Sequence, residues 1–154
     1  MSEDLTAADV AAQEAELVLP SLSEDDALDL GALLVARARE RALPVAIEVR
    51  RAGRVLFRAA LPGTSPDNDS WLERKARVVE RYGRSTLQVR LSYEERGTTF
   101  EAATGLPLSE YAAHGGGFPL SVVGTGVVGF VGVSGLPQRE DHAFLVEVLR
   151  DYLG

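Results

Sequence analysis

The sequence has no cysteine among its 154 residues, which excludes a disulfide framework, a thiolate metal site and a redox-active thiol. It also lacks any apolar run near the roughly 18 to 20 residues of a membrane span, and its start lacks the basic and apolar segments of a secretory signal. We therefore expect a cytoplasmic protein with no membrane span.

Lysine and histidine are nearly as scarce. One lysine, Lys75, stands beside fifteen arginines, and the two histidines are His114 and His142. The histidines do not have the His-Glu-x-x-His spacing of a zinc site, and no Gly-x-Ser-x-Gly segment marks a serine nucleophile. The catalytic residues are therefore unknown from the sequence, and a conventional enzyme is the less favoured class.

Charge is unevenly distributed along the chain. The net charge is −7, and residues 1–30 carry nine acidic side chains and no basic one. Residues 37–96 carry fourteen basic side chains, but eight acidic side chains are interleaved with them. A nucleic-acid binder needs a clustered basic surface, so no nucleic-acid partner is expected.

The N-terminal part is predicted to form two helices and then a hairpin. Thr6 and Ser23 can serve as N-caps, because acidic side chains follow each of them in the first helical turn. We interpret residues 1–22 as an acidic helix with a linker and residues 23–154 as a single domain. Residues 45–61 contain two apolar runs separated by a turn, which predicts two strands, the first with one solvent-exposed face.

The middle of the chain is less clear. Residues 62–69 are rich in proline, glycine, asparagine and aspartate and are predicted to be a loop. A helix with an apolar stripe is expected from about Asp69 to Gly83. Residues 85–96 are ambiguous: their apolar residues alternate as in a strand, although the charged end is typical of a helix, and the periodicity favours a strand.

The C-terminal part has the clearest pattern. Apolar residues 118–123 and 127–133 flank Gly124-Thr125-Gly126, which predicts a tight hairpin, and an amphipathic helix follows to Leu153. The segment from Gly124 matches the dinucleotide fingerprint Gly-x-Gly-x-x-Gly, but that fingerprint opens a helix, whereas β-branched residues here indicate a strand. The order of elements predicts an α/β (α+β) protein, a three-layer α/β/α domain around a central antiparallel sheet.

Candidate ligand-binding residues lie at the triple glycine and on the third helix. His114 precedes Gly115-Gly116-Gly117 and Phe118, a stretch that we expect to be mobile, so His114 is either a ligand-binding residue or a structural one. Lys75 follows Trp71 by one helical turn. Its ammonium group can neutralise an anionic ligand or extend to solvent from a packed stem, and the second role is favoured.

Several segments together resemble a known family. They are His114-Gly-Gly-Gly-Phe-Pro-Leu120, Val128-Gly-Phe-Val-Gly-Val-Ser-Gly135, Ser134-Gly-Leu-Pro-Gln-x-Glu-Asp-His142 and Trp71-x-x-Arg74-Lys75. From about residue 24 to the C-terminus, the chain resembles the haem-degrading-domain family, also called GlcG/HbpS-like, and within it a cytosolic uncharacterised branch.

The resemblance implies a profilin-like fold, a helix instead of a strand at residues 85–96, and homo-oligomers. Some relatives bind haem or cobalamin-like tetrapyrroles and promote haem breakdown, and a fungal relative is tied to the handling of tail-anchored proteins. The resemblance thus makes haem the candidate cofactor and haem degradation the candidate activity.

These observations lead to one expected function and one alternative. The first is an oligomeric protein with a small-ligand pocket for haem or a related tetrapyrrole, with His114 as the metal ligand. The alternative is a non-catalytic interaction or scaffold module. The expected pocket residues are His114, Gly115, Gly116, Gly117, Phe118, Trp71 and Lys75.

Overall fold

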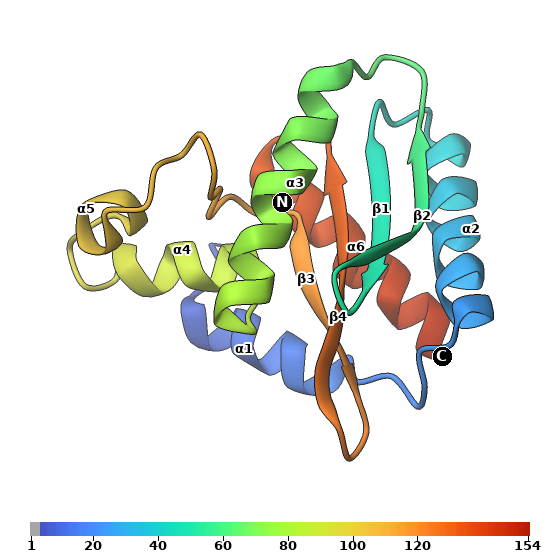
Figure 1. The fold of residues 1–154 in the computed structure, drawn as a ribbon, viewed down its shortest axis with the longest axis horizontal. Helices are drawn as coiled ribbons and strands as arrows, with labels where there is room; N and C mark the ends of the chain where they lie inside the picture. Colours follow the sequence, from blue (N-terminus) through green and yellow to red (C-terminus); the bar gives the residue numbers. More distant parts are fainter. Residues whose placement is uncertain (1–3) are drawn as a thin grey trace.

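The computed structural model describes residues 4–154, which form six helices and one four-stranded sheet (Figure 1). The α+β class predicted from the sequence is confirmed. Along the chain the elements are α1 (Ala7–Glu16), α2 (Glu24–Glu40), β1 (Ala46–Arg51), β2 (Arg54–Ala60), α3 (Pro66–Tyr82), α4 (Thr86–Glu94), α5 (Phe100–Thr104), β3 (Gly117–Val122), β4 (Gly126–Ser134) and α6 (Gln138–Leu153).

The sheet is antiparallel throughout, in the order β2-β1-β4-β3. Both predicted hairpins are present, and β4 inserts beside β1, so that Val49 lies opposite Val131. Gly124 and Gly126 have φ values of 76° and 100° at the β3–β4 turn, a backbone region that glycine adopts without steric cost. The two central strands thus come from opposite ends of the chain.

Helices cover both faces of the sheet (Figure 1). On one face, α2 and α6 pack against the apolar side chains of β1, β3 and β4 and enclose the largest hydrophobic core. On the other face, α3 crosses β1, β3 and β4, and α1 packs on α4 beside it. The result is the predicted three-layer α/β/α arrangement.

The prediction that β1 has one solvent-exposed face is wrong. Glu48 and Arg50, the polar side chains of that face, are 0% and 7% exposed because α3 covers them. Arg50 pairs with Glu48 and donates a hydrogen bond of 2.9 Å to Glu73 Oε2 on α3. Both faces of β1 are therefore buried. Its alternating polar residues lie among ionic partners, and its apolar residues lie in the hydrophobic core.

Helix α3 begins three residues earlier than the sequence pattern indicated. Ser65 is the N-cap, Pro66 occupies the first helical turn, and the side chain of Asn68 accepts a hydrogen bond from the backbone of Ser65 at 2.9 Å. The predicted loop at residues 62–69 is therefore too long, because a proline at the start of a helix was interpreted as part of a loop.

Residues 85–96 contain α4, so the strand favoured by periodicity is wrong and the helix implied by the family resemblance is confirmed. Ser85 caps this helix by accepting a hydrogen bond of 3.2 Å from the backbone of Gln88. Leu87 and Leu91, one helical turn apart, pack against α1. Over so few residues, the spacing of the apolar side chains fits both the two-residue period of a strand and the 3.6-residue period of a helix.

Leu145→Ala tests the packing of α6 on the sheet. Leu145 is 0% exposed in the main core, so its truncation should lower the free energy of unfolding by about 2 to 5 kcal/mol. Urea unfolding measures this change. Leu28→Ala, at a leucine that is 47% exposed on α2, is the control and should change stability by less than about 0.5 kcal/mol. Equal effects of both substitutions would contradict the core assignment.

Candidate functional site

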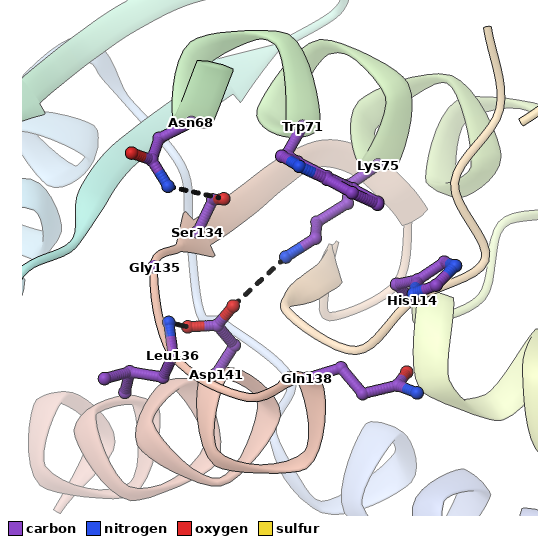
Figure 2. A pocket seen from close by; sticks show the side chains of 9 residues that line it. All are labelled: Asn68, Trp71, Lys75, His114, Ser134, Gly135, Leu136, Gln138 and Asp141. Carbon is purple, nitrogen blue, oxygen red and sulfur yellow. Dashed lines mark hydrogen bonds and ion pairs between the residues drawn. The ribbon is translucent and has the colours of Figure 1, made fainter. Parts of the chain in front are cut away.

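A cavity of about 290 Å³ lies between α3, the end of β4 and the start of α6 (Figure 2). Its wall combines charged, amide, hydroxyl and aromatic side chains, which is typical of sites that orient a small ligand. The lining residues are Asn68, Trp71, Lys75, His114, Ser134, Gly135, Leu136, Gln138 and Asp141.

An ion pair between Lys75 and Asp141 crosses the inner wall of this cavity. Lys75 Nζ lies 3.2 Å from Asp141 Oδ2 and donates a hydrogen bond of 2.9 Å to the carbonyl of Val133. Asp141 Oδ1 accepts a hydrogen bond of 3.1 Å from the backbone of Leu136. The two side chains are 3% and 2% exposed, so the expected extension of Lys75 into solvent is wrong, because α6 covers it.

Burial acts on the two members of this pair in opposite directions. Loss of solvation raises the pKa of Asp141 to about 6, although Lys75 and the backbone hydrogen bonds oppose that rise. Loss of solvation also lowers the pKa of Lys75, partly offset by Asp141. Burial therefore reduces the tendency of each group to carry its charge, and the contact between the two groups opposes that effect.

Trp71 and His114 form the outer wall. Their rings meet edge to face with centroids 5.1 Å apart, and the guanidinium of Arg74 lies 4.0 Å from the centre of the indole. Burial, followed by the positive charges of Arg90 and Lys75, lowers the pKa of His114 and keeps its imidazole neutral near pH 7. The fold therefore brings together three of the predicted site residues, Trp71, Lys75 and His114.

The triple glycine lies beside the cavity, where it is buried and held by hydrogen bonds. Gly115 N donates to the side chain of Gln138 at 2.8 Å, and Gly117 N donates to Thr86 Oγ1 at 2.9 Å. A Cβ on Gly116, which has a φ of 120°, would lie 2.6 Å from Lys75 Nζ. The expectation of a mobile stretch is therefore wrong, and these glycines permit close packing around the lysine.

Phe118 and His142 lie behind the site and do not line the cavity. Both are 0% exposed, and their ring centroids are 6.0 Å apart. His142 Nε2 hydrogen-bonds with Gln13 Oε1 at 2.7 Å, and burial lowers the pKa of this histidine to about 4. Phe118 and His142 are therefore core residues that pack behind the side chains lining the cavity.

The sequence interpretation missed four polar groups of the cavity. Asn68 Nδ2 hydrogen-bonds with Ser134 Oγ at 3.3 Å, and this contact ties α3 to the end of β4. Gln138 and Asp141 enter from the first turns of α6. The segment from Ser134 to His142 carries part of the family resemblance, and it could have indicated Ser134, Gln138 and Asp141 as site residues.

Within residues 4–154, no group of three or more histidine, aspartate or glutamate side chains could hold a metal ion. No helix in this part of the chain is both long and apolar enough to cross a membrane. Of the histidine, aspartate and glutamate residues, His114 and Asp141 line the cavity.

The fold and cavity define a three-layer α/β/α domain with a ligand-sized pocket between its outer helices. A family model described as "Haem degrading protein HbpS-like" matches residues 22–150. The chain therefore belongs to the HbpS-like family of haem degrading proteins, as the resemblance had implied.

The similar sequences include UPF0303 proteins. One from Streptomyces avermitilis is 54% identical over 148 residues, which cover 96% of this chain and 91% of that protein. Another, from Paraburkholderia xenovorans, is 46% identical over 145 residues, which cover 94% of this chain and 88% of that protein. Similarity therefore extends over nearly the whole chain, including α1.

Solved structures show the same fold. The Ybr137w protein matches with a TM-score of 0.87 at 29% identity over 95% of this chain and 87% of that one. HbpS matches with a TM-score of 0.68 at 21% identity over 86% and 90% of the two chains. A PduOC:heme complex matches with a TM-score of 0.70 at 20% identity over 84% and 94%. At such low identity, the last two comparisons show the fold alone.

Asp141→Asn tests the electrostatics of the buried pair. Because burial raises the pKa of Asp141 from 3.8 to about 6, its stabilising contribution is complete below about pH 4 and is lost as pH rises through 6. Asparagine does not titrate, so the variant does not lose this contribution. The free energy of unfolding of the variant minus that of the parent should therefore rise by on the order of 3 kcal/mol between pH 4 and pH 7. Urea unfolding across that range measures the difference.

Asp151→Asn provides the matched control, since Asp151 is an exposed carboxylate on the same helix. Because Asp151 is exposed and pairs with Arg37 at 3.4 Å, the stability difference between this variant and the parent should stay within about 1 kcal/mol across the range, so the two profiles run nearly parallel. A parallel profile for Asp141→Asn as well would show that Asp141 titrates in the folded protein as it does in the unfolded chain.

Proposed function

We propose that this protein binds a small ligand in the cavity between α3 and α6. The observation that carries the proposal is the buried Lys75–Asp141 pair on the cavity wall. Taking two charges out of water costs several kcal/mol per ion, and a buried pair adds little net stability. Strongly perturbed ionisable groups that line a cleft are typical of functional sites.

Haem is the ligand that family membership suggests, and the residues fit it only in part. His114 has a neutral imidazole on the outer wall, which is the form that coordinates iron. The cavity of about 290 Å³, however, is at the lower limit of the roughly 300–1,000 Å³ that encloses a drug-sized ligand. A porphyrin is therefore too large to be enclosed, and binding on His114 would leave most of the ring outside.

A haem titration followed by Soret absorption tests this role. If His114 is the axial ligand, the parent protein should bind saturably and His114→Ala should bind at least about tenfold more weakly, because the only imidazole on the cavity wall is lost. His142→Gln is the control and should bind like the parent, since His142 lies outside the cavity. The fluorescence of Trp71, the only tryptophan, reports occupancy of the cavity in the same samples.

Equal saturable binding by both histidine variants would remove His114 as the ligand. Absence of saturable haem binding by the parent would exclude haem as the ligand, and smaller molecules would then be the candidate ligands of the cavity.

A second candidate function, self-association or scaffolding, is favoured by the β3–β4 hairpin. This hairpin extends beyond the rest of the sheet (Figure 1), and Val123 and Val127 near its tip are 68% and 46% exposed. A hollow of about 500 Å³ beside it is lined partly by Val79, Val127 and Val128. Exposed apolar surface of this kind marks contact sites, and the partner proposed here is a second copy of the chain.

The double variant Val123→Asp/Val127→Asp tests self-association. The parent should sediment as a species larger than the 16.5 kDa chain at micromolar concentration, and the double variant should shift towards the monomer because charges would be buried at the contact. Leu108→Asp is the control, at a leucine that is 40% exposed in another part of the molecule. A parent that sediments only at 16.5 kDa would exclude this function.

A further inference from the structure

The only lysine of the sequence is buried. Fifteen of the sixteen lysine and arginine residues are arginine, and the exception, Lys75, lies in the cavity with 3% of its side chain exposed. Lysine and arginine both carry a positive charge, so a site that requires only a positive charge could equally contain arginine. A primary amine, unlike a guanidinium, readily loses its proton when buried and can then act as a nucleophile.

Lys75 Nζ is closely packed on the side of Gly116, whereas Lys75 also lines the cavity. The backbone of Gly116 packs so closely that an added Cβ would lie 2.6 Å from Nζ and from the carbonyl of Val133. That carbonyl also accepts a hydrogen bond from Nζ at 2.9 Å and fixes the position of the nitrogen. Figure 2 shows the amine extending from α3 towards Asp141, with the indole of Trp71 above it.

Asp141 supplies a proton carrier next to the nitrogen. Its Oδ2 lies 3.2 Å from Nζ, within reach for direct proton transfer. Burial raises the pKa of Asp141 to about 6 and lowers the pKa of Lys75, which brings the proton affinities of the two groups closer together. The backbone of Leu136 holds the other carboxyl oxygen, which keeps the group oriented.

We propose that Lys75 forms an imine with a small carbonyl compound that enters the cavity, and that Asp141 transfers the protons. This inference rests on the proposed ligand-binding function and names its ligand class. The other donors on the wall, from Trp71, His114 and Gln138, suit a ligand with oxygen atoms beside the carbonyl group. A 2-oxo acid has both features and is small enough to be enclosed.

The reaction balances without a further reactant. The nitrogen lone pair of Lys75 attacks the carbonyl carbon, and the electron pair of the carbonyl π bond moves to oxygen, which takes a proton from Asp141. The nitrogen then returns a proton to Asp141. In the second step the hydroxyl group takes that proton from Asp141 and leaves as water, while the nitrogen lone pair forms the C=N bond. The second proton of the amine then moves to Asp141, which returns to its starting form.

Reductive trapping tests the inference. The protein is incubated with pyruvate and sodium cyanoborohydride at pH 7, and the reduced adducts are located by peptide mass spectrometry. The variant Arg54→Lys adds one lysine at the exposed start of β2 and is otherwise the parent protein. An exposed lysine is only about 0.04% neutral at pH 7. We therefore expect the adduct on Lys75 to form at least about tenfold faster than the adduct at position 54.

Two further variants separate the roles of the pair. Lys75→Arg keeps the positive charge but should lose the cavity adduct, and Asp141→Asn should slow the formation of the adduct on Lys75 while leaving the adduct at position 54 unchanged. The N-terminal amine provides an internal reference in every sample. An adduct confined to the N-terminus and position 54, or equal rates at positions 54 and 75, would overturn the inference.

The fluorescence of Trp71 distinguishes this failure from failure of the proposed function. Saturable quenching by pyruvate without an adduct on Lys75 would show a cavity that binds the compound but forms no imine. Neither quenching nor an adduct would overturn the inference and also remove 2-oxo acids from the ligands of the cavity.

Discussion

The contact between Lys75 and Asp141 links the two outer layers at one end of the sheet. Lys75 belongs to α3, Asp141 belongs to α6, and these helices lie on opposite faces of the sheet. Their side chains meet at the end of β4, where the carbonyl of Val133 accepts a hydrogen bond from the same nitrogen atom. One short buried contact therefore links three elements of the fold, and the cavity lies next to it.

This contact requires a very close approach by the backbone, which explains the glycines nearby. Gly116 lies against Lys75 Nζ, and Gly115 lies against the first turn of α6, near the carbonyl of Gln138. Gly135 approaches the carbonyl of Pro44 where β4 ends. A side chain at any of these positions would displace backbone or the buried lysine. The glycine-rich segments thus serve packing at the site, and their density does not indicate mobility.

Much of the fold could be predicted from the sequence because its signals are local. The Thr6 and Ser23 caps, the β3–β4 turn and the apolar stripe of α6 each depend on residues within a few positions of one another. The burial of Glu48 and the short strand-like pattern of α4 could not be predicted in this way. Both depend on segments distant in the sequence: α3 covers Glu48, and α1 packs against Leu87 and Leu91.

The site shows the same limit. Trp71, Lys75 and His114 were identified because rare residue types stand out in a sequence, but their partner Asp141 is one of twenty-three acidic residues. Only the fold shows that this carboxylate is the one held against the lysine. Spacing also suggested that Lys75 could reach solvent, since a helix on its own leaves a long side chain free to extend. Because α6 covers the side chain, Lys75 cannot extend into solvent. Its nitrogen is instead buried 3.2 Å from Oδ2 of Asp141.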